Sequence, residues 1–176
     1  MNQLEISDLI HRAEEGDVDS QVELGTRYAS GNDIPKNQEL AIQWYTKAAV
    51  QESSEAQYNL ALMYLFGEGV EQSKKVAIEL LSRAASNGSS DACLVLGEAF
   101  ELGSLELDVD YFLAAKCYVE AFRLGSTKGI QCLGSLIESG RVDLKELGNM
   151  MSNYELGAFP EIADSAEVLR ALRGHP

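Results

Sequence analysis

Side chains that could carry out catalysis are few and scattered along this sequence. The only two histidines, His11 and His175, lie in the end segments, which leaves little for a histidine general base or a metal-binding triad. Three cysteines, an odd number without CxxC spacing, favour free buried thiols over a disulfide framework or a zinc site; they are Cys93, Cys117 and Cys132. Neither a GxGxxG segment after a strand nor a Walker motif occurs. We therefore expect no catalytic residue, no metal and no cofactor.

Carboxylates are the most abundant ionisable groups, and they set the charge of the chain. The 176 residues include 28 Asp and Glu against 14 Lys and Arg, so the formal net charge is -14. With so many acids, two neighbouring carboxylates are weak evidence for acid–base catalysis. The charge disfavours nucleic acid and anionic membranes as partners, and it favours a basic protein or peptide.

One group of acids falls within a single short stretch, at Glu101, Glu106, Asp108 and Asp110. Such a group could serve a basic ligand or a cation. The spacing lacks the obligatory Gly and the terminal Glu of a calcium loop, so a solvated loop is the favoured interpretation.

Composition and the N-terminal stretch predict a soluble protein. A hydrophobic content of 45% and a charged content of 24% are typical of a chain that buries a core. The stretch MNQLEISDLIHRAEEGD has no basic region followed by an apolar run, so it does not predict a secretory signal. No stretch approaches the roughly 18 apolar residues of a membrane span. We expect a cytoplasmic protein.

An eight-residue pattern occurs four times and indicates the elements of the fold. LGTRYASG begins at residue 24, LALMYLFG at 60, LGEAFELG at 96 and LGSLIESG at 133, so the period is 36 or 37 residues. In each octet a Leu precedes Gly or Ala, an aromatic or branched residue lies four positions after the Leu, and Gly comes last. This spacing places two bulky groups on one helix face, and the small residue lets a neighbouring helix approach closely. The final Gly supplies a left-handed cap.

A second helical stripe follows each octet, with small residues where two helices must pack tightly. In the first repeat it consists of Ala41, Tyr45 and the pair Ala48-Ala49. Residues with capping side chains, each contributing about 1 kcal/mol, precede both kinds of helix. They are Asp17, Ser53, Ser89 and Ser126 before the first helices, and Asn37, Ser73, Asp110 and Asp143 before the second. Each repeat is therefore predicted to be a helical hairpin.

Both ends of the chain match half of a repeat. Residues 3–15 align with a second helix and residues 161–172 with a first helix, so they would cover the apolar ends of a stack. We expect one domain over 1–176, with a capping helix in 1–16, hairpins at 17–52, 53–88, 89–125 and 126–157, and a capping helix in 158–176. The predicted fold class is all-α, a stack of antiparallel helical hairpins with half-repeat caps at both ends.

The repeated pattern resembles the Sel1-like repeat family, a relative of the tetratricopeptide repeat. The resemblance rests on Leu-Gly, an aromatic three residues after the Gly, a loop glycine, then Ala, the aromatic pair Trp44-Tyr45 and Ala-Ala. It covers roughly residues 17 to 140, although Leu80-Leu81 replaces the aromatic pair in the second repeat and the fourth loop is shorter. The resemblance implies a right-handed α-solenoid whose first helices line a concave face. It also implies a scaffold, adaptor or regulator that holds another protein.

By the same resemblance, the concave positions lie two residues before the Leu of each octet and two, five and six residues after it. These positions are apolar and aromatic in the second repeat and partly acidic in the third. Large apolar residues next to charges are typical of a binding site. The residues expected to bind a partner are Tyr58, Leu62, Phe66, Leu94, Glu98 and Glu101. The alternative is that Tyr58, Leu62 and Phe66 pack between adjacent hairpins.

Charge, motifs and resemblance together predict a non-catalytic protein–protein interaction module that binds a basic protein or peptide through its concave face. It would act as an adaptor or scaffold, or as an inhibitor or immunity protein against a cationic toxin, and the residues do not separate these roles. A hydrolase of the cysteine-rich Sel1-like type and an architectural subunit of a larger complex are the alternatives. The lack of a convergent nucleophile and base speaks against the hydrolase.

Overall fold

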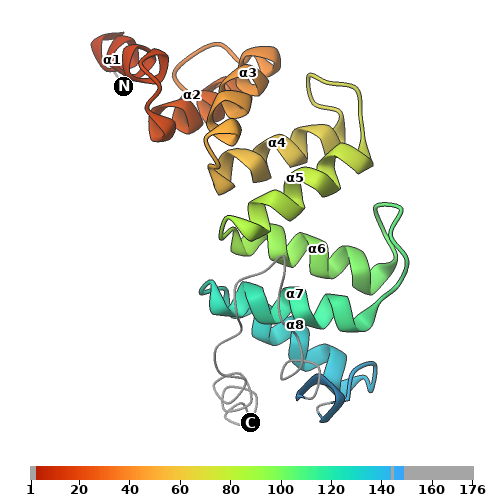
Figure 1. Cartoon of the computed structure of the whole chain (residues 1–176). Helices are drawn as coiled ribbons and strands as arrows, with labels where there is room; N and C mark the ends of the chain where they lie inside the picture. Colours follow the sequence, from red (N-terminus) through yellow and green to blue (C-terminus); the bar gives the residue numbers. More distant parts are fainter. Residues whose placement is uncertain (1–2, 144, 149–176) are drawn as a thin grey trace. The chain divides into compact units, whose positions relative to one another are not determined.

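The computed structural model describes residues 3–143 and 145–148, and this part of the chain is helical and contains no strand (Figure 1). The helices are α1 (Gln3–Glu14), α2 (Val18–Ser30), α3 (Gln38–Val50), α4 (Ser54–Phe66), α5 (Lys74–Ser86), α6 (Ser90–Leu102), α7 (Tyr111–Arg123) and α8 (Thr127–Glu138). The predicted all-α fold is confirmed. The capping helix expected in 158–176 lies outside the described residues.

Neighbouring helices pack in the pairs that the repeat period predicts. Helix α2 packs against α3, α4 against α5, and α6 against α7, while α1 covers α2 and α8 covers α7. The contacts divide the chain into two compact units, Met1–Asn87 with α1 to α5 and Gly88–Pro176 with α6 to α8. Each unit has its own hydrophobic core, built mainly from the Leu, Ala and Tyr positions of the repeat.

Capping side chains start the helices as predicted, with one exception. The side-chain oxygens that accept a first-turn N–H bond are those of Asp17, Asn37, Ser53, Ser73, Ser89 and Asp110. Asp143 accepts bonds of 2.8 and 3.1 Å from the N–H groups of Lys145 and Glu146. Ser126 precedes α8, but its side chain makes no capping bond, so that prediction is wrong. A capping Ser126 hydroxyl would accept a bond from the N–H of Gly129. That N–H donates instead to the backbone carbonyl of Ser126 at 3.1 Å.

In the first and third repeats the small residue of the octet lies beneath a tyrosine ring of the second helix. A Cβ atom added to Gly25 would lie 2.8 Å from ring carbons of Tyr45, and one added to Gly97 would lie 2.5 Å from Cε1 of Tyr118. Carbon atoms pack at about 3.5–4.0 Å, so both positions require glycine. The second repeat has alanine in place of this glycine and leucine in place of the tyrosine.

Two buried glutamines connect successive hairpins of the first unit. The Nε2 group of Gln21 donates to a carbonyl at the end of α1 at 3.0 Å, and its Oε1 accepts a bond from Gln51 at 2.9 Å. One period later, Gln57 donates to a carbonyl of α3 at 3.1 Å and accepts a bond from Asn87 at 3.0 Å. Because buried amides must be paired, these bonds fix the spacing of the hairpins.

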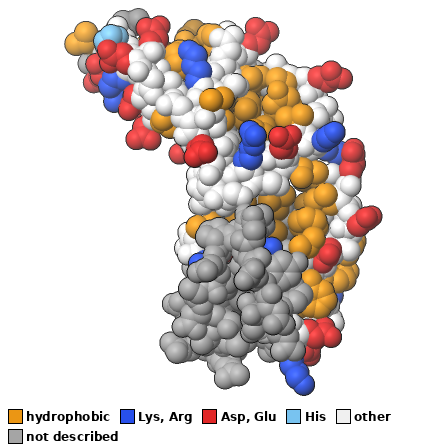
Figure 2. All heavy atoms as spheres, in the orientation of Figure 1, with side chains coloured by type: hydrophobic (Ala, Val, Ile, Leu, Met, Phe, Trp, Pro, Cys, Tyr) orange, Lys and Arg blue, Asp and Glu red, His pale blue; other side chains and the backbone are white. Residues whose placement is uncertain are grey.

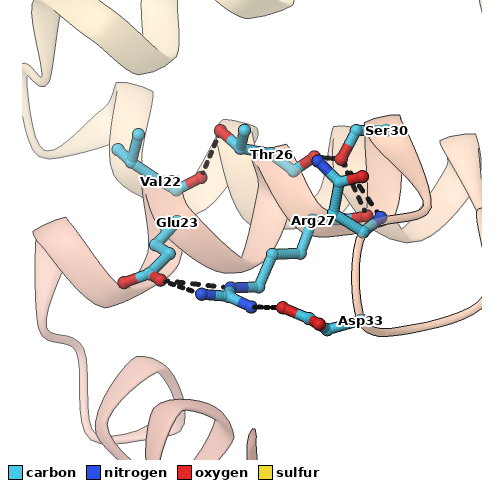
Figure 3. A network of polar contacts seen from close by, with 7 residues as sticks. Val22, Glu23, Thr26, Arg27, Ser30 and Asp33 are labelled. Atoms are coloured by element: carbon cyan, nitrogen blue, oxygen red, sulfur yellow. Dashed lines mark hydrogen bonds and ion pairs between the residues drawn. The ribbon is translucent and has the colours of Figure 1, made fainter. Parts of the chain in front are cut away.

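An arginine holds the loop between α2 and α3 (Figure 3). The guanidinium of Arg27 donates to Glu23 one turn earlier and to Oδ2 of Asp33 in the loop at 2.7 Å, and its side chain is only 17% exposed. Asp33 has a φ of 64°, a left-handed conformation that the second repeat gives to Gly69 at 73°. Glycine adopts this backbone conformation with less strain than aspartate does. The ion pair with Arg27 therefore offsets part of the backbone strain at Asp33.

Candidate partner-binding site

The second unit contains a cavity of about 250 Å³ along one face of α6. Residues three and four apart lie on the same face of a helix, so Leu94, Glu98 and Glu101 lie together. The lining residues are Leu94, Glu98, Glu101 and Leu102 of α6, Tyr118 of α7, and Lys128 and Cys132 of α8. Half of the residues expected from the sequence to bind a partner thus line this cavity.

Glu101 is the best-positioned polar group of the cavity because both of its carboxylate oxygens are bonded. The hydroxyl of Tyr118 donates to Oε2 at 2.8 Å, and Nη1 of Arg141 donates to Oε1 at 2.9 Å. Glu101 is 19% exposed and Arg141 is 45% exposed. The guanidinium of Arg141 also lies 5.2 Å from the ring centre of Tyr111, within the range of a cation–π contact.

The environment keeps the Tyr118 hydroxyl protonated. Burial, followed by the hydrogen bond to the Glu101 carboxylate, raises the pKa of Tyr118 above its ordinary value. The phenol therefore stays a hydrogen-bond donor throughout the physiological pH range, and it orients Glu101 instead of acting as a base.

The thiols of the second unit are not activated. All three cysteines are free, as predicted, although Cys132 is half-buried where full burial was expected. Burial raises the pKa of Cys93 and of Cys117 to about 12. Burial also raises the pKa of Cys132, Lys128 opposes this, and nearby carboxylates add to it. A thiol with a raised pKa is a poor nucleophile at neutral pH, so the cavity lacks an activated cysteine.

The other three expected residues lie on α4 in the first unit and do not line this cavity. Tyr58 and Leu62 are half-buried, whereas Phe66 is 66% exposed at the last position of the helix. Leu102 has the same position in α6 and is 62% exposed. The two repeats thus expose a large apolar side chain at the same point, immediately before the capping glycine.

The acidic stretch at the end of α6 and in the loop that follows is divided between different roles. Asp110 caps α7 through two bonds from backbone N–H groups at 2.9 and 3.0 Å. Glu106 and Asp108 lie exposed in the loop, and Glu101 belongs to the cavity. Within residues 3–143 and 145–148, no three His, Cys, Asp or Glu side chains are grouped so that they could hold a metal ion.

The first unit has a cavity at the corresponding repeat position, of about 360 Å³. It is lined by Asp19, Val22, Glu23 and Thr26 of α2 and Glu55 of α4. Val22 and Thr26, drawn in Figure 3, have the repeat positions of Leu94 and Glu98. The Thr26 hydroxyl lies 3.0 Å from the Tyr45 hydroxyl. As with Tyr118 and Glu101, a tyrosine of the second helix is thus hydrogen-bonded to a cavity-lining residue of the first helix.

Sequence reasoning missed four residues around the α6 cavity, namely Tyr118, Lys128, Cys132 and Arg141. Tyr118 has the packing-stripe position that Tyr45 has in the first repeat, yet its hydroxyl reaches Glu101 in the cavity. The matching position of Tyr45 in the first repeat is a signal that could have found it. No local pattern marks Lys128, Cys132 or Arg141, because they lie in or after the next repeat's first helix.

Comparison with known proteins agrees with this repeat architecture. The Sel1 repeat pattern matches residues 18–51, 54–89 and 90–126, which together make up more than half of the chain. The chain belongs to the Sel1 repeat family. No curated protein matches it. The family and fold indicate protein–protein interaction as the general mode of action. None of the described helices is long and apolar enough to cross a membrane.

Solved structures of Sel1 repeat proteins and of related repeat proteins are similar to this chain. A Sel1 repeat protein from Oxalobacter formigenes is 33% identical with a TM-score of 0.66, over 74% of this chain and 98% of that one. The protective antigen c5321 of uropathogenic Escherichia coli, with an SLR fold, is 28% identical with a TM-score of 0.72 over 84% of this chain. This chain covers only 32% of the length of c5321. Cysteine rich protein B of Helicobacter pylori is 25% identical with a TM-score of 0.58, over 72% of this chain and 95% of that one.

Proposed function

We propose that this Sel1 repeat protein is a non-catalytic binding module and that its α6 cavity receives a basic side chain of a partner protein or peptide. The observation that carries the proposal is the cavity lining, in which Leu94 and Leu102 lie beside the carboxylates of Glu98 and Glu101. Lysine and arginine combine an apolar stem with a cationic head, so they match both parts of this lining.

The charge of the whole chain supports a basic partner. A formal net charge of -14 attracts cationic proteins and speeds their association. Figure 2 shows acidic side chains spread over the described part of the visible surface. Because charges are screened over about 8 Å at physiological ionic strength, association should slow as salt is added.

Tyr58, Leu62 and Phe66 are proposed as a separate apolar contact on the first unit. Phe66 is 66% exposed, and exposed aromatic side chains frequently anchor a partner. Phe66→Glu should therefore weaken partner capture and leave the melting temperature nearly unchanged. A large drop in melting temperature would instead mean that Phe66 is needed for packing.

In the cell, the proposed module is a cytoplasmic adaptor or scaffold, or an inhibitor or immunity protein against a cationic toxin. The two roles differ in what happens to the bound protein. An inhibitor abolishes the activity of its partner at stoichiometric amounts, whereas an adaptor leaves that activity intact. Measuring the activity of an identified partner with and without this protein separates them.

Selection of peptides tests the proposed chemistry without a known partner. The full chain is used to select binders from a random dodecapeptide library, and the dissociation constant of the best peptide is measured by calorimetry. We expect binders enriched in Lys and Arg. Glu98→Gln should weaken binding by about fivefold or more, as expected for the loss of a close charge pair.

Asp91→Asn is the matched control, because Asp91 is an exposed acid of α6 that does not line the cavity. It removes the same charge and should change the affinity by less than about twofold. Binders without basic residues, or equal losses in the two variants, would contradict the proposed site.

A further inference from the structure

Arg141 already binds one of the two carboxylates in the α6 cavity. Its guanidinium donates to Oε1 of Glu101 at 2.9 Å and lies 5.2 Å from the ring centre of Tyr111. A carboxylate combined with an aromatic face is a pair of contacts that suits arginine better than lysine. We propose that Arg141 is an internal competitor, which holds Glu101 in the free protein and is displaced by an arginine side chain of the partner. This inference rests on the proposed function of the cavity.

The contacts of Arg141 are weak enough to be exchanged. Arg141 lies in the turn after α8, 40 residues from Glu101, and its side chain is 45% exposed. Ion pairs with this exposure contribute little to stability, because water and salt screen them. An incoming arginine would replace one ion pair by another of the same kind.

Glu101 would keep its position during this exchange. Its second oxygen, Oε2, accepts the 2.8 Å bond from the hydroxyl of Tyr118, a buried residue of α7. The raised pKa of Tyr118 keeps that donor protonated. The carboxylate is thus preorganised by Tyr118, while the bond to Arg141 at Oε1 is the one that opens.

Arg141 also sets the local charge of the site. Glu98 and Glu101 are balanced by Lys128 in the cavity lining and by Arg141 beside it. Removal of Arg141, by displacement or by mutation, leaves an excess of negative charge at Glu101. A cationic group of the partner then restores the balance.

The test uses the full chain and two capped tripeptides, Ac-Leu-Arg-Leu-NH2 and Ac-Leu-Lys-Leu-NH2, titrated by NMR. Arg141→Gln should bind the arginine peptide about two- to fivefold more tightly than the wild type, a range set by the strength of a half-exposed ion pair. The arginine peptide should bind more tightly than the lysine peptide. Arg83→Gln is the matched control, since it removes one positive charge from an exposed position of α5 in the first unit. It should leave the affinity unchanged.

A folding check and a second variant keep the test decisive. If Arg141→Gln lowers the melting temperature, the titration is repeated with Arg141→Lys. Lysine keeps the charge but loses the planar contacts of the guanidinium, so this variant should tighten binding by a smaller factor than Arg141→Gln. If Glu98→Gln weakens peptide binding but neither Arg141 variant strengthens it, the internal competitor is refuted and the proposed function stands. If the arginine peptide binds to none of these proteins, both are refuted. Equal tightening by Arg83→Gln, or equal binding of the two peptides, would also refute the arginine competition.

Discussion

The contact between Gly97 of α6 and the ring of Tyr118 provides a direct test of how tightly these helices pack. A methyl group at position 97 would lie 2.5 Å from Cε1 and 2.7 Å from Cδ1 of Tyr118. Since carbon atoms pack at about 3.5–4.0 Å, the ring would have to move by about 1 Å. That movement would disturb the hydroxyl, which lies 2.8 Å from Oε2 of Glu101. Gly97→Ala should therefore overpack a buried contact and weaken a hydrogen bond.

The expected loss follows from three terms. Overpacking costs about 1–3 kcal/mol, and weakening the bond to a charged acceptor adds about 1 kcal/mol. Alanine is the better helix former by about 1 kcal/mol, which offsets part of the cost. Gly97→Ala should thus lower the free energy of unfolding by about 1–3 kcal/mol. The control is Ala61→Gly at the same position of α4, where the reverse exchange should also destabilise, by about 1 kcal/mol.

Combining Gly97→Ala with Tyr118→Leu reproduces the pairing of Ala61 with Leu81 in the second repeat. The double variant should be more stable than the sum of the two single losses predicts, by about 1–2 kcal/mol. Urea unfolding followed by circular dichroism gives the midpoint and the slope for each variant. A higher midpoint for Gly97→Ala, or strictly additive losses, would refute this account of the packing.

Further predictions concern a strained backbone and the thiols. Glu52 has a φ of 65° where the other repeats have glycine. Glu52→Gly should therefore raise the free energy of unfolding by about 0.5–1 kcal/mol and move the urea midpoint upward. A downward shift of the midpoint would contradict backbone strain at this position. In native protein at pH 8, iodoacetamide should modify the half-buried Cys132 before Cys93 and Cys117, because burial raises the pKa of the latter two thiols to about 12. Mass spectrometry that finds Cys93 or Cys117 alkylated first would disprove this order of reactivity.

The helices could be predicted because their signals are local. Helices α2, α4 and α6 each begin one residue after a predicted cap, and each ends one residue before a left-handed glycine. Both signals act between groups a few residues apart, so the order of residue types suffices to place them. The resemblance to Sel1-like repeats, and not a local signal, assigned Leu94, Glu98 and Glu101 to the concave positions of one helix before any packing was known.

The rest of the α6 cavity depends on packing that no local pattern specifies. The Tyr118 hydroxyl reaches a carboxylate 17 residues earlier, and Arg141 reaches the same carboxylate from 40 residues later. Both contacts require the helices to be in their final positions and the side chains in particular rotamers. Ser126 shows the converse, because it has a capping residue type at a capping position, yet its backbone carbonyl takes the bond instead.

In the first three repeats, the residue at the Tyr118 position agrees with the polarity of the facing helix. A buried hydroxyl needs a partner, and Tyr45 finds Thr26 at 3.0 Å while Tyr118 finds Glu101 at 2.8 Å. In the second repeat Leu81 has no hydroxyl, and α4 has leucine at the position of Thr26 and also at the position of Glu101. The carboxylate of Glu101 therefore has a structural partner as well as the binding role that we propose for it. Because the hydroxyl of Tyr118 holds Oε2, the carboxylate stays oriented while Oε1, which Arg141 binds in this structure, is the oxygen that we propose a partner cation takes over.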